Sequence, residues 1–178
     1  MLQLTHRESN FTEKKFPVIL VLDGLTSPAN IGSIFRFSDS FNIEKMIFCG
    51  FSPDLQSNRL RRTARSTLEK VSFGHEEKAV EACKELKKKG YNLVALEITD
   101  RSISVEDYPV TTGQKIALII GNEKTGISEE VLKMAKQGIH ITMFGKNSSM
   151  NVAQATGIAL YEITKKLDRL NRNNIFTQ

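Results

Sequence analysis

The chain has 178 residues, of which 40% are hydrophobic, and this is enough for one compact domain with a substantial core, which excludes a disordered chain. It carries 25 Lys and Arg against 20 Asp and Glu, and the net charge of +5 favours an anionic partner without identifying one. Cys49 and Cys83 belong to no metal-binding or redox motif, and no apolar run is long enough to span a bilayer. We therefore expect a soluble, cytoplasmic protein without membrane association or a metal site.

Strands and helices alternate along the first half of the chain. Residues 17–24, PVILVLDG, form a short apolar run typical of a buried strand, and residues 30–41 follow with an apolar helical face. A second strand is expected at 45–50. An arginine-rich segment at 57–74 follows, to which we assign no element, and then a helix that ends at Gly90 behind three lysines.

Three further strands are expected in the second half, at 91–98, 114–121 and 138–144. A short helix at 128–136 has Ser128 in place to cap its N-terminus, and a longer helix opens at about 149 and runs to 167. This alternation predicts an α/β fold with a mostly parallel, Rossmann-like sheet. We expect a single domain over 1–178, with a short lead at 1–16 and a frayed tail from about 171 to 178.

The last predicted helix contains unusually small residues. Gly157 lies inside it, and a glycine there costs about 1 kcal/mol relative to alanine. We therefore expect another part of the backbone to approach this helix closely.

Three polar loops, at 23–41, 119–130 and 141–157, follow predicted strands, which is where open α/β sheets bind ligands. The sequence GNEKTG is not a Walker motif, since Glu123 and Leu118 stand where that motif needs glycine. No predicted strand is followed by G-x-G-x-x-G either. The common nucleotide-binding motifs are therefore excluded.

Taken together, these loops resemble the three motifs of the SpoU, or TrmH-like, family of RNA 2'-O-ribose methyltransferases in the SPOUT superfamily. The first motif resembles residues 27–50, with Asn30 and Arg36 at its signature positions, and the second resembles residues 116–128. The third resembles residues 139–162, where Ser149, Met150 and Asn151 match a Ser-Leu-Asn signature. The resemblance covers about 17–167, and it departs from the family at Thr142, commonly proline, and at Ala153, often serine.

The resemblance implies a C-terminal deep trefoil knot that binds S-adenosyl-L-methionine in a bent form, without metal. It also implies a homodimer in which the last helix lies at the subunit interface and Arg36 lies near the partner's cofactor. Backbone groups would hold the cofactor and aliphatic side chains would sandwich its adenine. The residues implied at the cofactor are Leu96, Glu97, Gly121, Asn122, Gly126, Ile141, Met143, Ser149, Met150 and Asn151.

The catalytic residues that the resemblance implies are Asn30, Arg36, Glu123, Ser149 and Asn151. A guanidinium resists deprotonation, so we interpret Arg36 as a group that positions the ribose and stabilises developing alkoxide charge, and not as a general base. Glu123, Asn30 and Asn151 either orient reacting groups or only satisfy loop backbone.

Four arginines in the unassigned segment, Arg59, Arg61, Arg62 and Arg65, are expected to bind RNA phosphates, although a solvated face would look the same. The predicted function is methylation of a ribose 2'-hydroxyl in structured RNA, with tRNA favoured over rRNA. Two alternatives stay open, a noncatalytic RNA-binding or assembly protein that retains the knot, and a base-methylating enzyme of the same superfamily.

Overall fold

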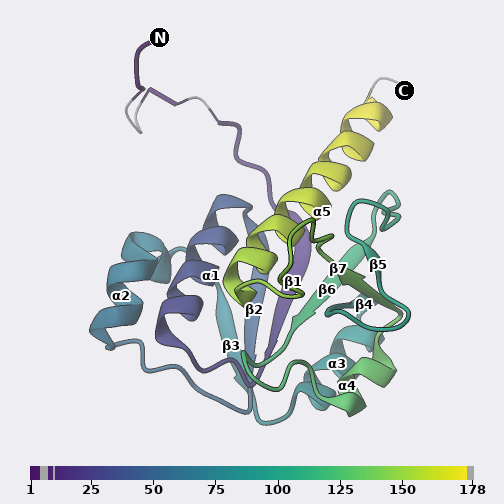
Figure 1. Ribbon diagram of the computed structural model, residues 1–178. Helices are drawn as coiled ribbons and strands as arrows, with labels where there is room; N and C mark the ends of the chain where they lie inside the picture. The colour runs from purple at the N-terminus through teal and green to yellow at the C-terminus, as the bar shows by residue number, and fades with distance from the viewer. Residues whose placement is uncertain (5–7, 10, 176–178) are drawn as a thin grey trace.

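The computed structural model describes residues 1–4, 8–9 and 11–175, which form one parallel sheet between two layers of helices (Figure 1). The described strands are β1 (Phe16–Asp23), β2 (Ile43–Cys49), β3 (Phe73–Glu76), β4 (Tyr91–Leu96), β5 (Ile103–Ser104), β6 (Lys115–Ile120) and β7 (Gln137–His140). The helices are α1 (Pro28–Ser40), α2 (Asn58–Ala64), α3 (Ala79–Lys88), α4 (Glu129–Met134) and α5 (Val152–Ile175), with a 3-10 turn η1 (Arg65–Glu69).

The strand order is β3-β2-β1-β6-β4-β7-β5, and neighbouring strands pair in parallel, which confirms the predicted α/β class with a mostly parallel sheet. The order of the strands reverses between β1 and β6, because β2 and β3 extend the sheet on one side and the later strands extend it on the other. The carboxyl ends of strands beside such a reversal form the usual ligand-binding crevice of an open α/β sheet.

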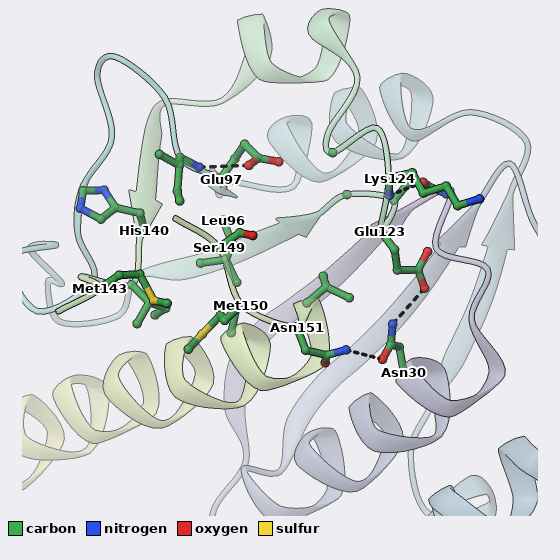
Figure 2. Close-up of a pocket in the computed structure, with 17 residues that line it drawn as sticks. Asn30, Leu96, Glu97, Glu123, Lys124, His140, Met143, Ser149, Met150 and Asn151 are labelled. Atoms are coloured by element: carbon green, nitrogen blue, oxygen red, sulfur yellow. Dashed lines mark hydrogen bonds between the residues drawn. The ribbon is translucent and has the colours of Figure 1, made fainter. Parts of the chain in front are cut away.

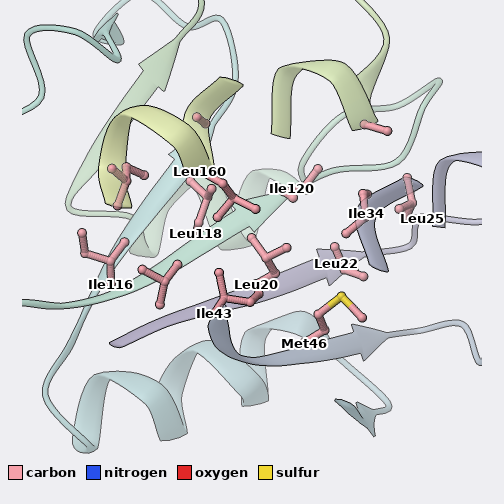
Figure 3. Packing of buried hydrophobic residues seen from close by; sticks show 14 of the residues in the cluster. Leu20, Leu22, Leu25, Ile34, Ile43, Met46, Ile116, Leu118, Ile120 and Leu160 are labelled. Atoms are coloured by element: carbon pink, nitrogen blue, oxygen red, sulfur yellow. The ribbon is translucent and has the colours of Figure 1, made fainter. Parts of the chain in front are cut away.

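Side chains of β1 alternate between two buried clusters, as a period of two requires. Leu20 and Leu22 pack in the cluster that includes residues of α1, α2 and α5, part of which Figure 3 shows. Ile19 and Val21 point to the opposite face, where α3 and α4 cover the sheet. The sheet is therefore buried on both faces, which explains the continuous apolar run at 17–22.

The arginine-rich segment at 57–74, for which the sequence predicts no element, forms α2, η1 and β3. Close packing against α1 explains why this segment forms regular structure. A Cβ atom at Gly32 would lie 2.7 Å from the Leu60 carbonyl oxygen and 2.8 Å from the Thr63 Cβ, so the two helices approach at a position where only glycine fits. Such packing between distant residues leaves no periodic signal in a short helix.

The last helix is longer than predicted. It begins at Val152 and continues to Ile175, so residues 171–175, expected to belong to the tail, are helical. Asp168 supports this extension, because its carboxylate lies 2.7 Å from the Lys14 ammonium and 2.7 Å from the Arg172 guanidinium. Residues 176–178 lie outside the described part of the chain. None of the described helices is both long and apolar enough to cross a lipid bilayer.

The expectation of a close backbone approach at Gly157 is wrong in one respect. The nearest group is the Phe37 ring of α1, which a Cβ atom at Gly157 would approach to 3.1 Å. Packing of α5 on an aromatic side chain of α1 is therefore the reason that this helix carries glycine at position 157.

Candidate functional site

A pocket of about 420 Å³ lies at the carboxyl ends of β4, β6 and β7, beside the first turns of α1 and α5 (Figure 2). Its size is within the usual range for small-molecule sites. All ten residues predicted at the cofactor line it, and so do four of the five predicted catalytic residues, Asn30, Glu123, Ser149 and Asn151. The prediction did not include five other lining residues, namely Ile98, Lys124, His140, Val152 and Ala155.

A tight turn between β6 and α4 forms one wall of the pocket. The backbone N–H groups of Asn122 and Gly126 each donate to the other residue's carbonyl oxygen, at 3.0 Å. A Cβ atom at Gly121 would lie 2.1 Å from the Gly126 carbonyl carbon, and Gly126 has a φ of +68°. Glycine is therefore required at both positions, and the turn brings backbone to the pocket surface.

The Asn122 side chain joins this turn to the loop that follows β1. Its Nδ2 donates to the Gly24 carbonyl oxygen at 2.7 Å, and its Oδ1 accepts from the Lys124 backbone N–H at 2.9 Å. Ser128 lies at the N-cap position of α4, but its hydroxyl donates to Asp23 Oδ2 at 2.7 Å instead of capping the helix. The ends of β1 and β6 are thus held together by side chains from both loops.

Three polar residues from the three loops form a continuous chain, which we call the amide network: Glu123, Asn30 and Asn151. Asn30 Nδ2 donates to Glu123 Oε1 at 3.1 Å, and Asn30 Oδ1 accepts from Asn151 Nδ2 at 2.9 Å (Figure 2). Asn151 Oδ1 in turn accepts the Ala153 backbone N–H at 2.9 Å, at the start of α5. An ionised carboxylate only accepts hydrogen bonds, so Glu123 fixes the orientation of both amides.

Glu123 also holds the N-terminal end of α1. Its carboxylate accepts the Ser27 backbone N–H at 2.9 Å and the Thr26 backbone N–H at 3.4 Å. Partial burial raises the pKa of Glu123, but hydrogen bonds from its own backbone N–H, from Ser27, from Asn30 and from Thr26 outweigh this and lower the pKa below its usual value. The carboxylate is therefore ionised at neutral pH, as the amide network requires.

The opposite part of the pocket combines one carboxylate with apolar side chains. Glu97 accepts the Ile98 backbone N–H at 3.1 Å and the Ile127 backbone N–H at 3.4 Å. Around it lie the aliphatic and thioether side chains of Leu96, Ile141, Met143 and Met150. This wall suits a ligand that has hydroxyl groups to donate and an apolar ring to bury.

Two sets of predicted functional residues lie away from the pocket. Arg36 is exposed on α1 and does not line the pocket. It follows Asn30 by six residues, which places it about 9 Å further along the helix and on a different face. The other set is Arg59, Arg61, Arg62 and Arg65, which are all exposed on α2 and η1. We call these four residues the arginine surface.

Comparison with known proteins identifies the family. Residues 17–161 match the model of the SpoU rRNA methylase family. The chain belongs to this family. A putative TrmH family tRNA/rRNA methyltransferase of Staphylococcus saprophyticus is 25% identical over 154 residues, which are 86% of this chain and 61% of that protein. A tRNA (guanosine(18)-2'-O)-methyltransferase of Borreliella burgdorferi is 30% identical over 136 residues, 76% of this chain and 58% of that protein.

Solved structures agree with this assignment. The SpoU methyltransferase AviRb of Streptomyces viridochromogenes, in complex with AdoMet, matches with a TM-score of 0.73 and 27% identity over 83% of this chain and 57% of that chain. A protein described for 2-OH methylation of C/U34 on tRNA matches with a TM-score of 0.72 and 26% identity over 86% of this chain and 99% of that chain. The chain spans about three fifths of the length of most of the curated relatives that it matches.

Proposed function

We propose that this chain is an S-adenosylmethionine-dependent RNA methyltransferase that modifies a ribose 2'-hydroxyl, with tRNA favoured over rRNA. The main support is that one pocket gathers the three motif loops of a SpoU family member, with all ten expected cofactor residues in its wall. The preference for tRNA rests on the match to a protein described for 2-OH methylation of C/U34 on tRNA, 99% of whose length is covered.

S-adenosyl-L-methionine is the cofactor, and when bound it supplies a methyl group on an electrophilic sulfonium. The pocket fits this molecule in volume and in chemistry. Glycine backbone at Gly121 and Gly126 allows close approach, Glu97 can accept hydrogen bonds from ribose hydroxyls, and the apolar wall can bury adenine. The AviRb structure contains the same cofactor in a protein of this family.

The amide network would position the substrate ribose indirectly, by fixing the ends of α1 and α5 at the pocket. Ser149 offers a hydroxyl at the pocket surface, where it can bond to the substrate or cofactor. Arg36 would bind the ribose and its phosphate and stabilise the charge that develops as the 2'-hydroxyl loses its proton. The arginine surface would bind the RNA backbone without selecting a sequence.

The proposed enzyme is a homodimer with a C-terminal trefoil knot. Arg36 supports the dimer, because it lies outside the pocket of its own chain and a second copy would bring its counterpart to that pocket. The exposed apolar side chains of Ile158 and Tyr161 on α5 offer a surface for the subunit contact. In the proposed knot, the loop at 141–151 and the helix α5 that follows it would pass through the other loops that line the pocket.

The direct test is methylation in vitro. Purified protein, S-adenosylmethionine labelled in the methyl group, and RNA from cells that lack the gene are incubated without added metal, and the RNA is digested to nucleosides. We expect the label in a 2'-O-methylnucleoside, in the tRNA fraction. Label in a methylated base would contradict ribose methylation and support the base-methylating alternative. The absence of label from the RNA would contradict the proposed activity.

A further inference from the structure

The aromatic side chain of Phe144 is exposed to solvent close to the pocket. Phe144, directly after the pocket-lining Met143, is 97% exposed and lies in the loop between β7 and α5. A second apolar side chain, that of Ile98, lines the pocket and is 56% exposed. Aromatic rings contribute large apolar areas to cores and interfaces, so a ring exposed close to a binding site is available to contact a bound ligand.

One cation lies close to this ring in the sequence. Lys146 follows Phe144 by two residues and is exposed, whereas Lys124, also exposed, lines the pocket beside Glu123, at the end away from Met143 (Figure 2). Neither lysine forms a salt bridge with another described residue. The loop that carries the exposed ring therefore also carries a cation, Lys146, that forms no salt bridge with a described residue.

We propose that Phe144 stacks on an unpaired nucleobase of the RNA substrate, close to the nucleotide whose ribose is methylated. This inference rests on the proposed function and adds a contact to a base. Unpaired bases are commonly recognised by stacking on exposed aromatic side chains, with nearby cations bound to the phosphates. Apart from its two chain neighbours, no described residue comes within 4 Å of a Cβ atom placed on Gly145, so the residue after Phe144 lies in open space.

The neighbours of Phe144 favour RNA over a second copy of this chain as the group that covers the ring. The four residues that follow it, 145–148, have the sequence GKNS and are all exposed. The cores of subunit interfaces are depleted of lysine and similar polar residues, whereas contacts to single-stranded RNA combine aromatic and basic residues.

Four variants test the stacking: Phe144→Ala, Phe144→Leu, Phe144→Trp and, as a control, Phe11→Ala. Phe11 is 93% exposed and lies in the N-terminal segment, so it matches Phe144 in exposure but not in position. The measurement is the Kd for a fluorescein-labelled single-stranded RNA oligonucleotide and for a duplex of the same length, without S-adenosylmethionine. We expect Phe144→Ala to bind the single strand about tenfold more weakly, Phe144→Leu to bind almost as weakly, and Phe144→Trp to bind like the wild type. Phe11→Ala and binding of the duplex should be unchanged.

Several outcomes would overturn the inference. Wild-type affinity of Phe144→Ala for the single strand would show that no base contacts the ring, and wild-type affinity of Phe144→Leu would show that aromatic stacking is not involved. A change in sedimentation of Phe144→Ala would show that a second copy covers the ring. Because binding is measured without methyl transfer, this test is independent of the nucleoside analysis that decides the proposed function. An unchanged thermal unfolding midpoint establishes that each variant is folded.

Discussion

In the amide network, Glu123, Asn30 and Asn151 are joined by hydrogen bonds of 3.1 and 2.9 Å that fix each side chain. On the arginine surface, the guanidinium groups extend into solvent, and among the described residues Arg61 donates to the Gln56 side chain at 2.9 Å. The first region is organised before any ligand binds, as a reaction site requires. The second can follow the irregular backbone of an RNA, and its contribution should depend on salt. The two regions should therefore respond differently to substitution.

Arg36 belongs to neither region, and its removal should have the largest effect. Arg36→Ala should lower the single-turnover rate of methyl transfer by about 10²–10³-fold, because in the proposed mechanism Arg36 stabilises charge in the transition state. Thermal unfolding and cofactor binding should be unchanged, since Arg36 is exposed and its proposed contacts are to the ribose and phosphate of the RNA and not to the cofactor.

Arg36→Lys separates charge from geometry at the same position. Lysine keeps the positive charge without the planar fork, so it should recover little activity if paired hydrogen bonds are needed. A near-normal rate for Arg36→Ala at saturating RNA and cofactor would show that Arg36 does not take part in the chemical step.

The glycine turn should be the next most sensitive feature. Gly121→Ala places a Cβ atom 2.1 Å from backbone, so the turn must shift, and we expect the free energy of unfolding to fall by about 2–3 kcal/mol. Added S-adenosylmethionine should then no longer raise the unfolding midpoint, as it should for the wild type. Gly145→Ala is the control, because apart from its chain neighbours no residue that the structure describes lies within 4 Å of its added Cβ. Equal stability of the two variants would show that the turn tolerates a side chain at position 121.

Replacing all four residues of the arginine surface by alanine should weaken RNA binding by about tenfold at moderate salt. The dependence of log Kd on log salt should become shallower by about 0.7–0.9 for each phosphate that the variant no longer binds. The stabilisation by S-adenosylmethionine should persist, because none of the four residues lines the pocket. An unchanged salt dependence would show that these four arginines are only solvated and do not bind RNA phosphates.

Glu123→Gln should have the smallest effect, and that effect should depend on pH. Hydrogen bonds lower the pKa of Glu123 in the folded protein, so its charge contributes stability above the unfolded-state pKa of about 4.3, and this contribution is lost as the pH falls through the folded pKa. We expect the variant to be about 1 kcal/mol less stable than the wild type at pH 7, and we expect this difference to be smaller at pH 3. A difference that is the same at both pH values would contradict the charged network.

The sequence predicts most of this fold because its signals are local. The apolar run of β1 and the helical face of Ile31, Ile34 and Phe35 in α1 follow from periodicity alone, and the structure buries them as expected. In contrast, α2 depends on packing against Gly32 of α1, and β5 has only two residues. Neither leaves a pattern in its own segment. The extension of α5 likewise depends on Lys14, which is distant in sequence.

For the site, the motif spacing predicts the wall of the pocket but not how its residues are connected. The hydrogen bonds from Asn30 to Glu123 and from Asn151 to Asn30 join residues that are 93 and 121 positions apart. Ile98 and Lys124 line the pocket beside residues that were predicted, but isolated aliphatic and basic side chains carry no motif. Their immediate neighbours, Glu97 and Glu123, were the signal that could have identified them. The position of Arg36 outside the pocket of its own chain is evident only in three dimensions.

The most direct test of the central claim is a map of ribose methylation in the RNA of cells with and without this gene. A 2'-O-methyl group protects the adjacent phosphodiester from alkaline hydrolysis, so each modified site is read as a gap in the cleavage pattern. We predict that deletion removes protection at a single site, in a tRNA, and that the wild-type gene restores it whereas a gene carrying Arg36→Ala does not. Identical cleavage patterns in both strains, or the loss of a methylated base in place of a ribose methyl group, would contradict the account.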